Sequence, residues 1–197
     1  MAQYNTTDKT AATGSEKRRT MRLFYAIEFE PAFRKMLWEQ ATCLRCQVYG
    51  GCWTCAEHLH LTLVFLGEIP HEQLDSYCEA MRQAAFAEVP FKMEIAGCGF
   101  FGRKEAVLWL GICNPAVICR LAAALRAALR QKDLAHDQKP FQPHITIARQ
   151  VNLLEKEPEW TDKKLFYTVK QVSLLESIRE NGRLVYRTLL RSNLGGS

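Results

Sequence analysis

The sequence lacks any long hydrophobic run, and this absence limits the class of protein to which it can belong. No apolar stretch reaches the roughly 18 residues that a membrane-spanning helix needs. The N-terminal residues also lack the apolar core of a signal peptide. Dense basic runs, which are typical of arm-like nucleic-acid binders, are missing as well. We therefore expect a cytoplasmic protein that makes no contact with a membrane.

Neither sign of charge dominates the sequence, and positive charge is in small excess. The 197 residues carry a formal net charge of +5, with 48% hydrophobic and 24% charged residues, as in an ordinary globular domain. Such a mild balance permits a phosphate-bearing partner without requiring one. Residues 1–20 are polar and show no periodicity, which predicts a disordered tail. We expect one domain over residues 21–192 and a loose C-terminus over residues 193–197.

Cysteine, by contrast, is plentiful, with eight residues. In a cytoplasmic protein these are expected to be reduced thiols. Four of them, Cys43, Cys46, Cys52 and Cys55, form two C-x-x-C pairs separated only by "QVYGG". Paired C-x-x-C motifs bind zinc when a longer loop lets the two pairs face each other. The short separation favours structural or incidental thiols, and a zinc site or a redox pair is the alternative that it leaves open.

Two short apolar segments each carry a histidine and a threonine two residues apart. They are "HLTLVFLG", which starts at His60, and "HITIAR", which starts at His144. In a strand, residues i and i+2 point to the same face. His60 and Thr62 should therefore project together, as should His144 and Thr146.

The two segments lie 84 residues apart, and the similarity extends upstream. "RLFYAIEFEPAF" at residues 22–33 aligns with "AVLWLGICNPAV" at residues 106–117. Each is a strand-like apolar run followed by Pro-Ala, and proline is well suited to the first turn of a helix. We predict helices over residues 31–42 and 115–131. A single weak repetition indicates two related lobes rather than a solenoid.

The remaining patterns complete an α+β fold. A third helix is predicted over residues 71–86. Trp53 and Trp109 are expected in the core. Strands are predicted at residues 21–29, 91–96, 106–112, 165–177 and 183–192, with a turn at "ENG" between the last two. Two lobes related by an approximate twofold axis would bring both histidine–threonine pairs to one central cleft.

Two histidines that face each other are suited to displacement at phosphorus. A neutral imidazole takes a proton from the attacking oxygen, and an imidazolium gives a proton to the leaving oxygen. An ordinary histidine pKa near 6.5 makes both forms accessible at neutral pH. Threonine hydroxyls can donate to the phosphate oxygens, and no metal or cofactor is needed. His58 shares the strand face of His60 but has no counterpart in the second segment, where Gln142 stands, so we expect it at the rim.

These segments, together with the start "MRLFYAIEF" and the later "VSLLES", resemble the two-histidine (2H) phosphoesterase superfamily. Within it they are similar to the RNA 2′,3′-cyclic phosphodiesterases, also called 2′-5′ RNA ligases. The resemblance covers about residues 21–190. It implies a bilobal α+β fold with two antiparallel sheets, helices on the outside and a central cleft. It also implies hydrolysis of a terminal 2′,3′-cyclic phosphate on RNA to a 2′-phosphate.

The resemblance assigns roles to four residues. His60 would be the proton donor to the leaving 3′ oxygen and His144 the proton acceptor that activates water. Thr62 and Thr146 would hold the phosphate. The expected partners are single-stranded RNA ends or nucleotides with a 2′,3′-cyclic phosphate, and we expect a monomer.

Two further residues are candidates for substrate binding. Arg149 follows the second motif and offers a cation to phosphate. Phe101, in "GFFGRKE", offers a ring on which a base of single-stranded RNA can stack. The alignment of the two segments places Phe65 opposite Arg149, so the two half-sites are not equivalent.

Several alternatives use the same residues. The alternative activities are ligation of RNA ends through a 2′-5′ bond and hydrolysis of another cyclic or 2′-5′-linked nucleotide. The sequence does not separate these activities, because acid and base would be unchanged. Alternatives without catalysis are an RNA-binding module and a zinc protein organised by the four-cysteine stretch.

Overall fold

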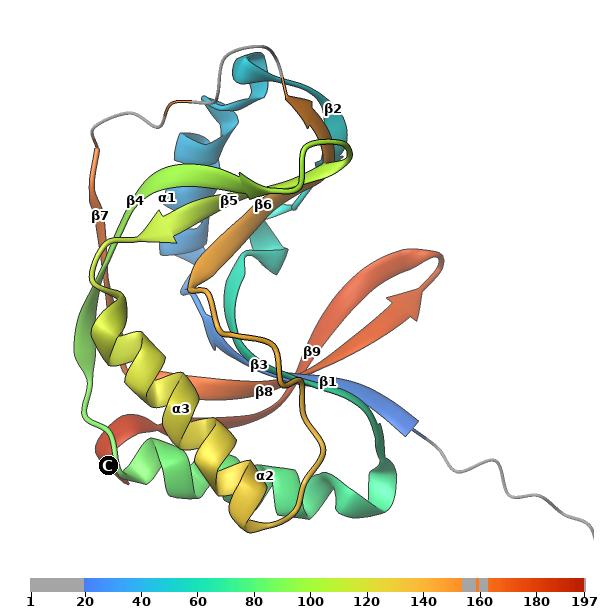
Figure 1. The fold of residues 1–197 in the computed structure, drawn as a ribbon, viewed down its shortest axis with the longest axis vertical. Helices are drawn as coiled ribbons and strands as arrows, with labels where there is room; N and C mark the ends of the chain where they lie inside the picture. Colours follow the sequence, from blue (N-terminus) through green and yellow to red (C-terminus); the bar gives the residue numbers. More distant parts are fainter. Residues whose placement is uncertain (1–19, 154–158, 160–162, 197) are drawn as a thin grey trace, which may run out of the picture.

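In the computed structural model, which describes residues 20–153, 159 and 163–196, two antiparallel sheets face each other (Figure 1). The first sheet has the strand order β3-β1-β8-β9, with bounds His60–Pro70, Thr20–Glu28, Gln171–Glu180 and Arg183–Asn193. The second has the order β2-β6-β5-β4-β7, with bounds Val48–Trp53, His144–Leu153, Ala106–Ile112, Phe91–Phe101 and Leu165–Val169. The predicted α+β architecture of two antiparallel sheets is confirmed.

Within the part of the chain that the structure describes, three α-helices accompany the sheets. They are α1 at Pro31–Thr42, α2 at Leu74–Phe86 and α3 at Pro115–Gln131. α1 and α3 begin at proline as predicted, because the missing N–H costs nothing in the first turn. α2 starts three residues later than expected, since His71–Gln73 form a 3₁₀ turn. Among the described residues, no helix combines the length and apolar character needed to cross a membrane.

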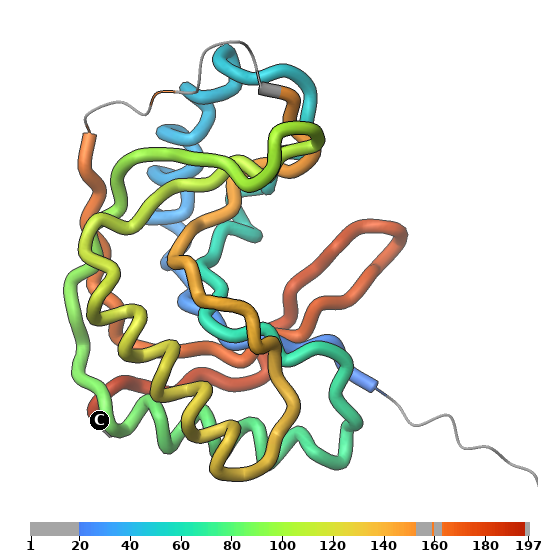
Figure 2. Tube along the Cα trace, viewed as in Figure 1, coloured from blue at the N-terminus to red at the C-terminus, as the bar shows by residue number. Residues whose placement is uncertain are grey.

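Each of the two related halves sends its helix to the opposite sheet (Figures 1 and 2). α1 follows β1 but packs on the second sheet, where the ring of Phe33 lies 4.7 Å from that of Tyr167 on β7. α3 follows β5 but packs against α2 and β3 of the first half. One continuous cluster of buried apolar side chains joins both halves. The two halves therefore share one hydrophobic core.

The structure differs from the predicted strands in three places. β2 lies within the cysteine-rich stretch and was missed, because its glycines and exposed residues give no apolar alternation. β4 continues to Phe101 instead of ending at residue 96. The single strand predicted over residues 165–177 is two strands, β7 and β8, that belong to different sheets and are separated by Lys170.

Both ends of the domain are more ordered than expected. Thr20 is the first residue of β1 and pairs with Pro70, while residues 1–19 of the predicted tail lie outside the described residues. The prediction of a loose C-terminus over residues 193–197 is wrong for residues 193–196, which the structure describes. β9 includes Asn193, and Leu194 is 1% exposed, with its amide donating to the carbonyl of Lys170. Burial of the leucine side chain ties this end to the core.

Candidate active site

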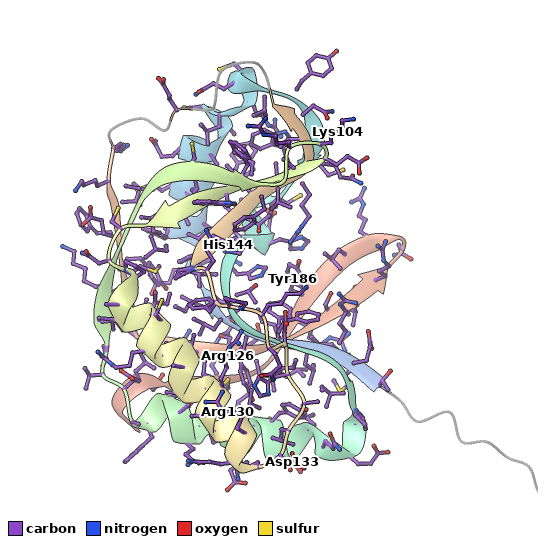
Figure 3. The ribbon with its side chains drawn as sticks, in the orientation of Figure 1. Lys104, Arg126, Arg130, Asp133, His144 and Tyr186 are labelled. Carbon is purple, nitrogen blue, oxygen red and sulfur yellow. The ribbon has the colours of Figure 1, made fainter. Side chains whose placement is uncertain are left out.

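The two motif strands present their side chains in the same alternation. On both β3 and β6, the histidine and the threonine are partly buried, and the residue after each is buried. The buried residues are Leu61 and Leu63 on β3, and Ile145 and Ile147 on β6. β3 and β6 contact each other, so both motifs open on the region between the sheets, where His144 is labelled in Figure 3. The predicted juxtaposition of the two strands is thus present.

Each motif histidine makes the same hydrogen bond to the backbone carbonyl of the residue two positions earlier. The Nδ1 atom of His60 lies 2.7 Å from the carbonyl oxygen of His58, and Nδ1 of His144 lies 2.7 Å from that of Gln142. A carbonyl oxygen can only accept, so Nδ1 must carry the proton in both rings. The nitrogen that remains to exchange a proton is Nε2 in both. His58 and Gln142, which differ as side chains, are equivalent through their carbonyls.

His60 has a partner for its Nε2 as well. That atom lies 3.1 Å from Oγ1 of Thr62, which can donate to it when the imidazole is neutral. The ring also packs against two aromatic rings, Phe24 at 5.2 Å and Tyr186 at 4.9 Å between centroids. Tyr186 also contacts the ring of His58 at 5.2 Å. These apolar walls reduce the access of water to His60.

His144 lies in a different aromatic environment. Its ring meets Phe101 edge-on at 4.9 Å and lies 6.3 Å from Trp109. Phe101, for which we expected contact with a base, is placed against the histidine. Trp109, expected in the core, lies beside the same ring because it is opposite Thr146 in the β5–β6 pairing and so shares the face of the motif.

Burial shifts both histidines toward the neutral form. It lowers the pKa of His60 to about 4, and the nearby Arg149 guanidinium adds to this effect. Burial, with a further contribution from Arg149, also lowers the pKa of His144 below its ordinary value. A neutral imidazole is ready to act as a base. An imidazole that acts as an acid must first gain a proton, which a bound anion would favour.

Glu28 distinguishes the two half-sites, and sequence analysis missed it. It is opposite His60 in the β1–β3 pairing, so the two side chains share a face, and its charge raises the pKa of His60 in opposition to burial. The residue opposite His144 is Gly111, which has no side chain to offer. One signal was available, since Glu28 interrupts the apolar run of the first strand.

A polar network holds the Glu28 carboxylate in place. Thr188 donates to it at 3.0 Å and Arg191 at 3.1 Å, both from β9. Burial alone would raise the pKa of Glu28, but the hydrogen bonds from Arg191 and Thr188 and the charge of Arg191 help bring the pKa below its ordinary value. The carboxylate is therefore ionised at neutral pH.

A cavity of about 650 Å³ opens beside His60. Of the predicted site residues, His60, Thr62 and Arg149 line it. His144 and Thr146 are not among the described residues that do so. The other lining residues come from β1, β3, β8 and β9: Thr20, Arg22, Phe24, Phe65, Glu68, Glu176, Ser177, Ile178, Arg179, Leu184 and Tyr186. The open space therefore lies on the His60 side of the site.

The four clustered cysteines are exposed, and none of them is in a disulfide bond. Three of their thiols have separate partners: Cys43 lies 3.9 Å from the carbonyl of Glu39, Cys46 lies 3.3 Å from that of Cys43, and Cys52 lies 3.4 Å from the side-chain oxygen of Gln150. Within the described residues, no three histidine, cysteine, aspartate or glutamate side chains are grouped as metal ligands. The zinc alternative thus gains no support from the geometry.

The sequence was compared with protein-family models and with known proteins, and both comparisons point to one family. The sequence model of the 2′-5′ RNA ligase superfamily matches residues 33–179. A protein of Escherichia coli named RNA 2′,3′-cyclic phosphodiesterase is 31% identical over 180 residues, which cover 86% of this chain and 94% of that protein. A Thermus thermophilus protein of the same name is 36% identical over 139 residues, or 66% of this chain and 68% of the relative. A Geobacillus stearothermophilus protein of that name is 37% identical over 99 residues, and the match spans only 32% of its length.

Solved structures agree with the sequence matches. The crystal structure of E. coli LigT complexed with 3′-AMP superposes with a TM-score of 0.75 at 28% identity, covering 89% of this chain and 99% of that one. A crystal structure of a Thermus thermophilus protein gives a TM-score of 0.77 at 32% identity, with the same coverage. The fold, the two motifs and the match over most of the sequence agree, and the chain belongs to the 2′-5′ RNA ligase superfamily.

Proposed function

We propose that this protein is a metal-independent RNA 2′,3′-cyclic phosphodiesterase, which hydrolyses a terminal 2′,3′-cyclic phosphate to a 2′-phosphate. The observation that carries the proposal is the pair of imidazoles on contacting strands, each with Nδ1 bound to a carbonyl and Nε2 left to exchange a proton. Relatives named for this activity support it. Neither proton transfer requires a metal-bound water.

In the proposed reaction, Nε2 of His144 takes a proton from a water molecule as its oxygen bonds to phosphorus. The bond between phosphorus and the 3′ oxygen breaks, and Nε2 of His60 gives its proton to that oxygen. Thr62 and Thr146 donate hydrogen bonds to the non-bridging oxygens, and Arg149 offsets their charge. Each positioned proton transfer typically contributes about 10²–10⁴-fold in rate.

The surroundings of the two histidines support this assignment of acid and base. The leaving 3′ oxygen stays attached to the nucleoside, so the acid must lie on the side that accommodates a nucleoside. The cavity opens beside His60, whereas Phe101 and Trp109 lie against His144. Glu28 is also opposite His60, where a negative charge stabilises the protonated form. A water molecule needs far less room than a nucleoside, and the His144 side suits it.

The lowered pKa of His60 makes its protonation depend on substrate. In the free protein a pKa of about 4 leaves the ring neutral at pH 7. The negative charge of a bound cyclic phosphate would raise that pKa, because an anion beside the ring favours the imidazolium. Substrate binding would thus charge the acid in the place where it is needed.

The test is a product assay on RNA that ends in a 2′,3′-cyclic phosphate, with separation of 2′-phosphate from 3′-phosphate ends. We expect only the 2′-phosphate, at a rate that EDTA leaves unchanged. Exclusive formation of the 3′-phosphate would show that the bond to the 2′ oxygen breaks, which contradicts the proposed reaction. Tight RNA binding without turnover would favour an RNA-binding module. We further propose that the protein works in the cytoplasm as a monomer; light scattering of the purified chain would test the monomeric state, and fractionation of cells would test the location.

A second candidate activity is joining of RNA ends through a 2′-5′ bond, which the name of the superfamily favours. The chemistry is the same displacement at phosphorus with the same two histidines, and a 5′-hydroxyl replaces water as the attacking group while the bond to the 3′ oxygen breaks. Incubation of a cyclic-phosphate end with a 5′-hydroxyl RNA would reveal it as a longer product.

A further inference from the structure

Strands β8 and β9 extend beyond the sheet to which they belong. β1 pairs with β8 only between Ala26↔Ser173 and Leu23↔Glu176. β8 and β9 stay paired as far as Glu180 and Arg183, joined by a two-residue turn in which both residues have positive φ. Residues 177–186 therefore form a two-stranded ribbon, which projects from the body of the molecule (Figure 1).

One face of the ribbon borders the cavity. Ser177 is opposite Tyr186, and Arg179 is opposite Leu184, so these four side chains share a face. All four line the cavity, as does Ile178, which lies on the other face. At the base of the ribbon, Tyr186 contacts the ring of His60 and lies toward the centre of the molecule (Figure 3).

The chemistry of this face fits a nucleotide. Leu184 is 42% exposed although it is a large apolar residue, and Tyr186 adds an aromatic ring. Bases of single-stranded nucleic acid stack on such surfaces, and arginine contacts the backbone phosphate. No carboxylate of the described residues is seen in an ion pair with Arg179. The carboxylates that also line the cavity, Glu68 and Glu176, each have an arginine at 3.8 Å that offsets their charge.

The cavity leads from the reaction site to this face. It begins at His60, Thr62 and Arg149 and ends at the ribbon, and its 650 Å³ lies within the range of about 300–1,000 Å³ for ligand sites. A terminal nucleotide held by its cyclic phosphate next to His60 would direct its 5′ oxygen away from the phosphate. The next phosphodiester along the chain would then approach the ribbon.

We propose that the ribbon face formed by Ser177, Arg179, Leu184 and Tyr186 binds the nucleotide on the 5′ side of the one that carries the cyclic phosphate. This inference rests on the proposed function and deepens it. Leu184 and Tyr186 pack against the base, and Arg179 binds the phosphodiester. The enzyme is thus built to act on the end of an RNA chain in preference to a free cyclic mononucleotide.

The experiment compares kcat/KM for a 2′,3′-cyclic mononucleotide and for a dinucleotide that ends in the same cyclic nucleotide. We expect the dinucleotide to be the better substrate by about tenfold, which is the effect of one added phosphate contact and one packed base. Arg179→Ala should lower the dinucleotide-to-mononucleotide ratio several-fold. It should also make the salt dependence of the dinucleotide reaction shallower by about 0.7 in the slope of log(kcat/KM) against log[salt]. Leu184→Ser should lower the ratio without changing that slope.

The matched control is Arg183→Ala. Arg183 is on the same ribbon and is exposed, but it is opposite Glu180 and so lies on the other face. It should leave the ratio and the slope at their wild-type values. Equal kcat/KM for the two substrates, or the same loss in Arg183→Ala as in Arg179→Ala, would overturn the inference while the proposed function stands. Failure to hydrolyse either substrate would instead overturn the proposed function.

Discussion

The two half-sites share their backbone and differ in their surroundings. His60 and His144 have the same Nδ1 hydrogen bond to the residue two positions earlier, and the same alternation follows each of them. Around His60 lie a carboxylate, a tyrosine from β9 and an open cavity, whereas Phe101 and Trp109 lie against His144. The repeat supplies two similar proton carriers. Residues that differ between the two copies of the repeat, Glu28 and Trp109, and strands from outside the repeat, β4 and β9, make them different. A reaction with one acid and one base needs that difference.

The largest expected effect is the loss of either imidazole. His60→Ala and His144→Ala should each lower kcat by about 10²–10⁴-fold on a cyclic-phosphate RNA, because each removes one proton transfer. Circular dichroism should show both variants folded, and His71→Ala, an exposed histidine outside the site, should keep full activity. Wild-type turnover in either motif variant would refute the two-imidazole mechanism.

The threonines should separate the half-sites through their pH dependence. Thr62→Val and Thr146→Val should each lower kcat by about 10²-fold, the typical loss of one donor to a developing anion. Only the Thr62 hydroxyl is seen to contact a histidine Nε2, at 3.1 Å. Only Thr62→Val should therefore also shift the pH profile of kcat/KM. Thr→Ser at either position should restore most of the rate, and identical pH profiles for the two valine variants would contradict the asymmetry.

Glu28 offers a smaller and more specific way to alter one half. Glu28→Gln removes the negative charge opposite His60, so the pKa of His60 should fall further and the imidazolium should persist only at lower pH. We expect a loss of about tenfold at neutral pH and an alkaline limb of the pH–rate profile displaced to lower pH. Glu28→Asp should keep the wild-type profile. Glu94→Gln, which breaks an ion pair with Lys164 on the second sheet, controls for the loss of a carboxylate and should not move that limb.

The smallest expected effect concerns stability. The pKa of His60 is about 4 in the folded protein, against roughly 6.5 when unfolded, so the unfolded state binds more protons between these values. The free energy of unfolding should fall as the pH is lowered through this window, by on the order of 1 kcal/mol between pH 7 and pH 5. Urea unfolding at the two pH values measures it. His60→Gln should remove this part of the slope; an unchanged slope would show that His60 is not buried as described.

The repeat made the central part of the fold predictable. Proline at positions 31 and 115 fixed the starts of α1 and α3, and the two histidine–threonine motifs predicted two strands with one open face. These signals are local, because they depend on residues a few positions apart. The same local logic missed β2, since an edge strand with two glycines carries no alternation.

The features that distinguish the half-sites could not be predicted in the same way. Glu28 and His60 are 32 positions apart, and Tyr186 is 126 positions from the histidine that it contacts. Such neighbours follow from strand order and register, which place β1 between β3 and β8. Sequence patterns set which residues are buried, but they do not say which strand lies next to which. Phe101 was predicted to bind substrate because of its aromatic ring. Strand order and register place this ring against His144, and it is not among the residues that line the cavity.

The assignment of His60 as the acid and His144 as the base is tested most directly by changing the leaving group. In a substrate whose bridging 3′ oxygen is replaced by sulfur, the thiolate leaves without needing a proton. On this substrate His60→Ala should regain most of the wild-type rate, while His144→Ala should remain inactive, because water still has to be deprotonated. Rescue of His144→Ala in place of His60→Ala, or of neither variant, would contradict the assignment.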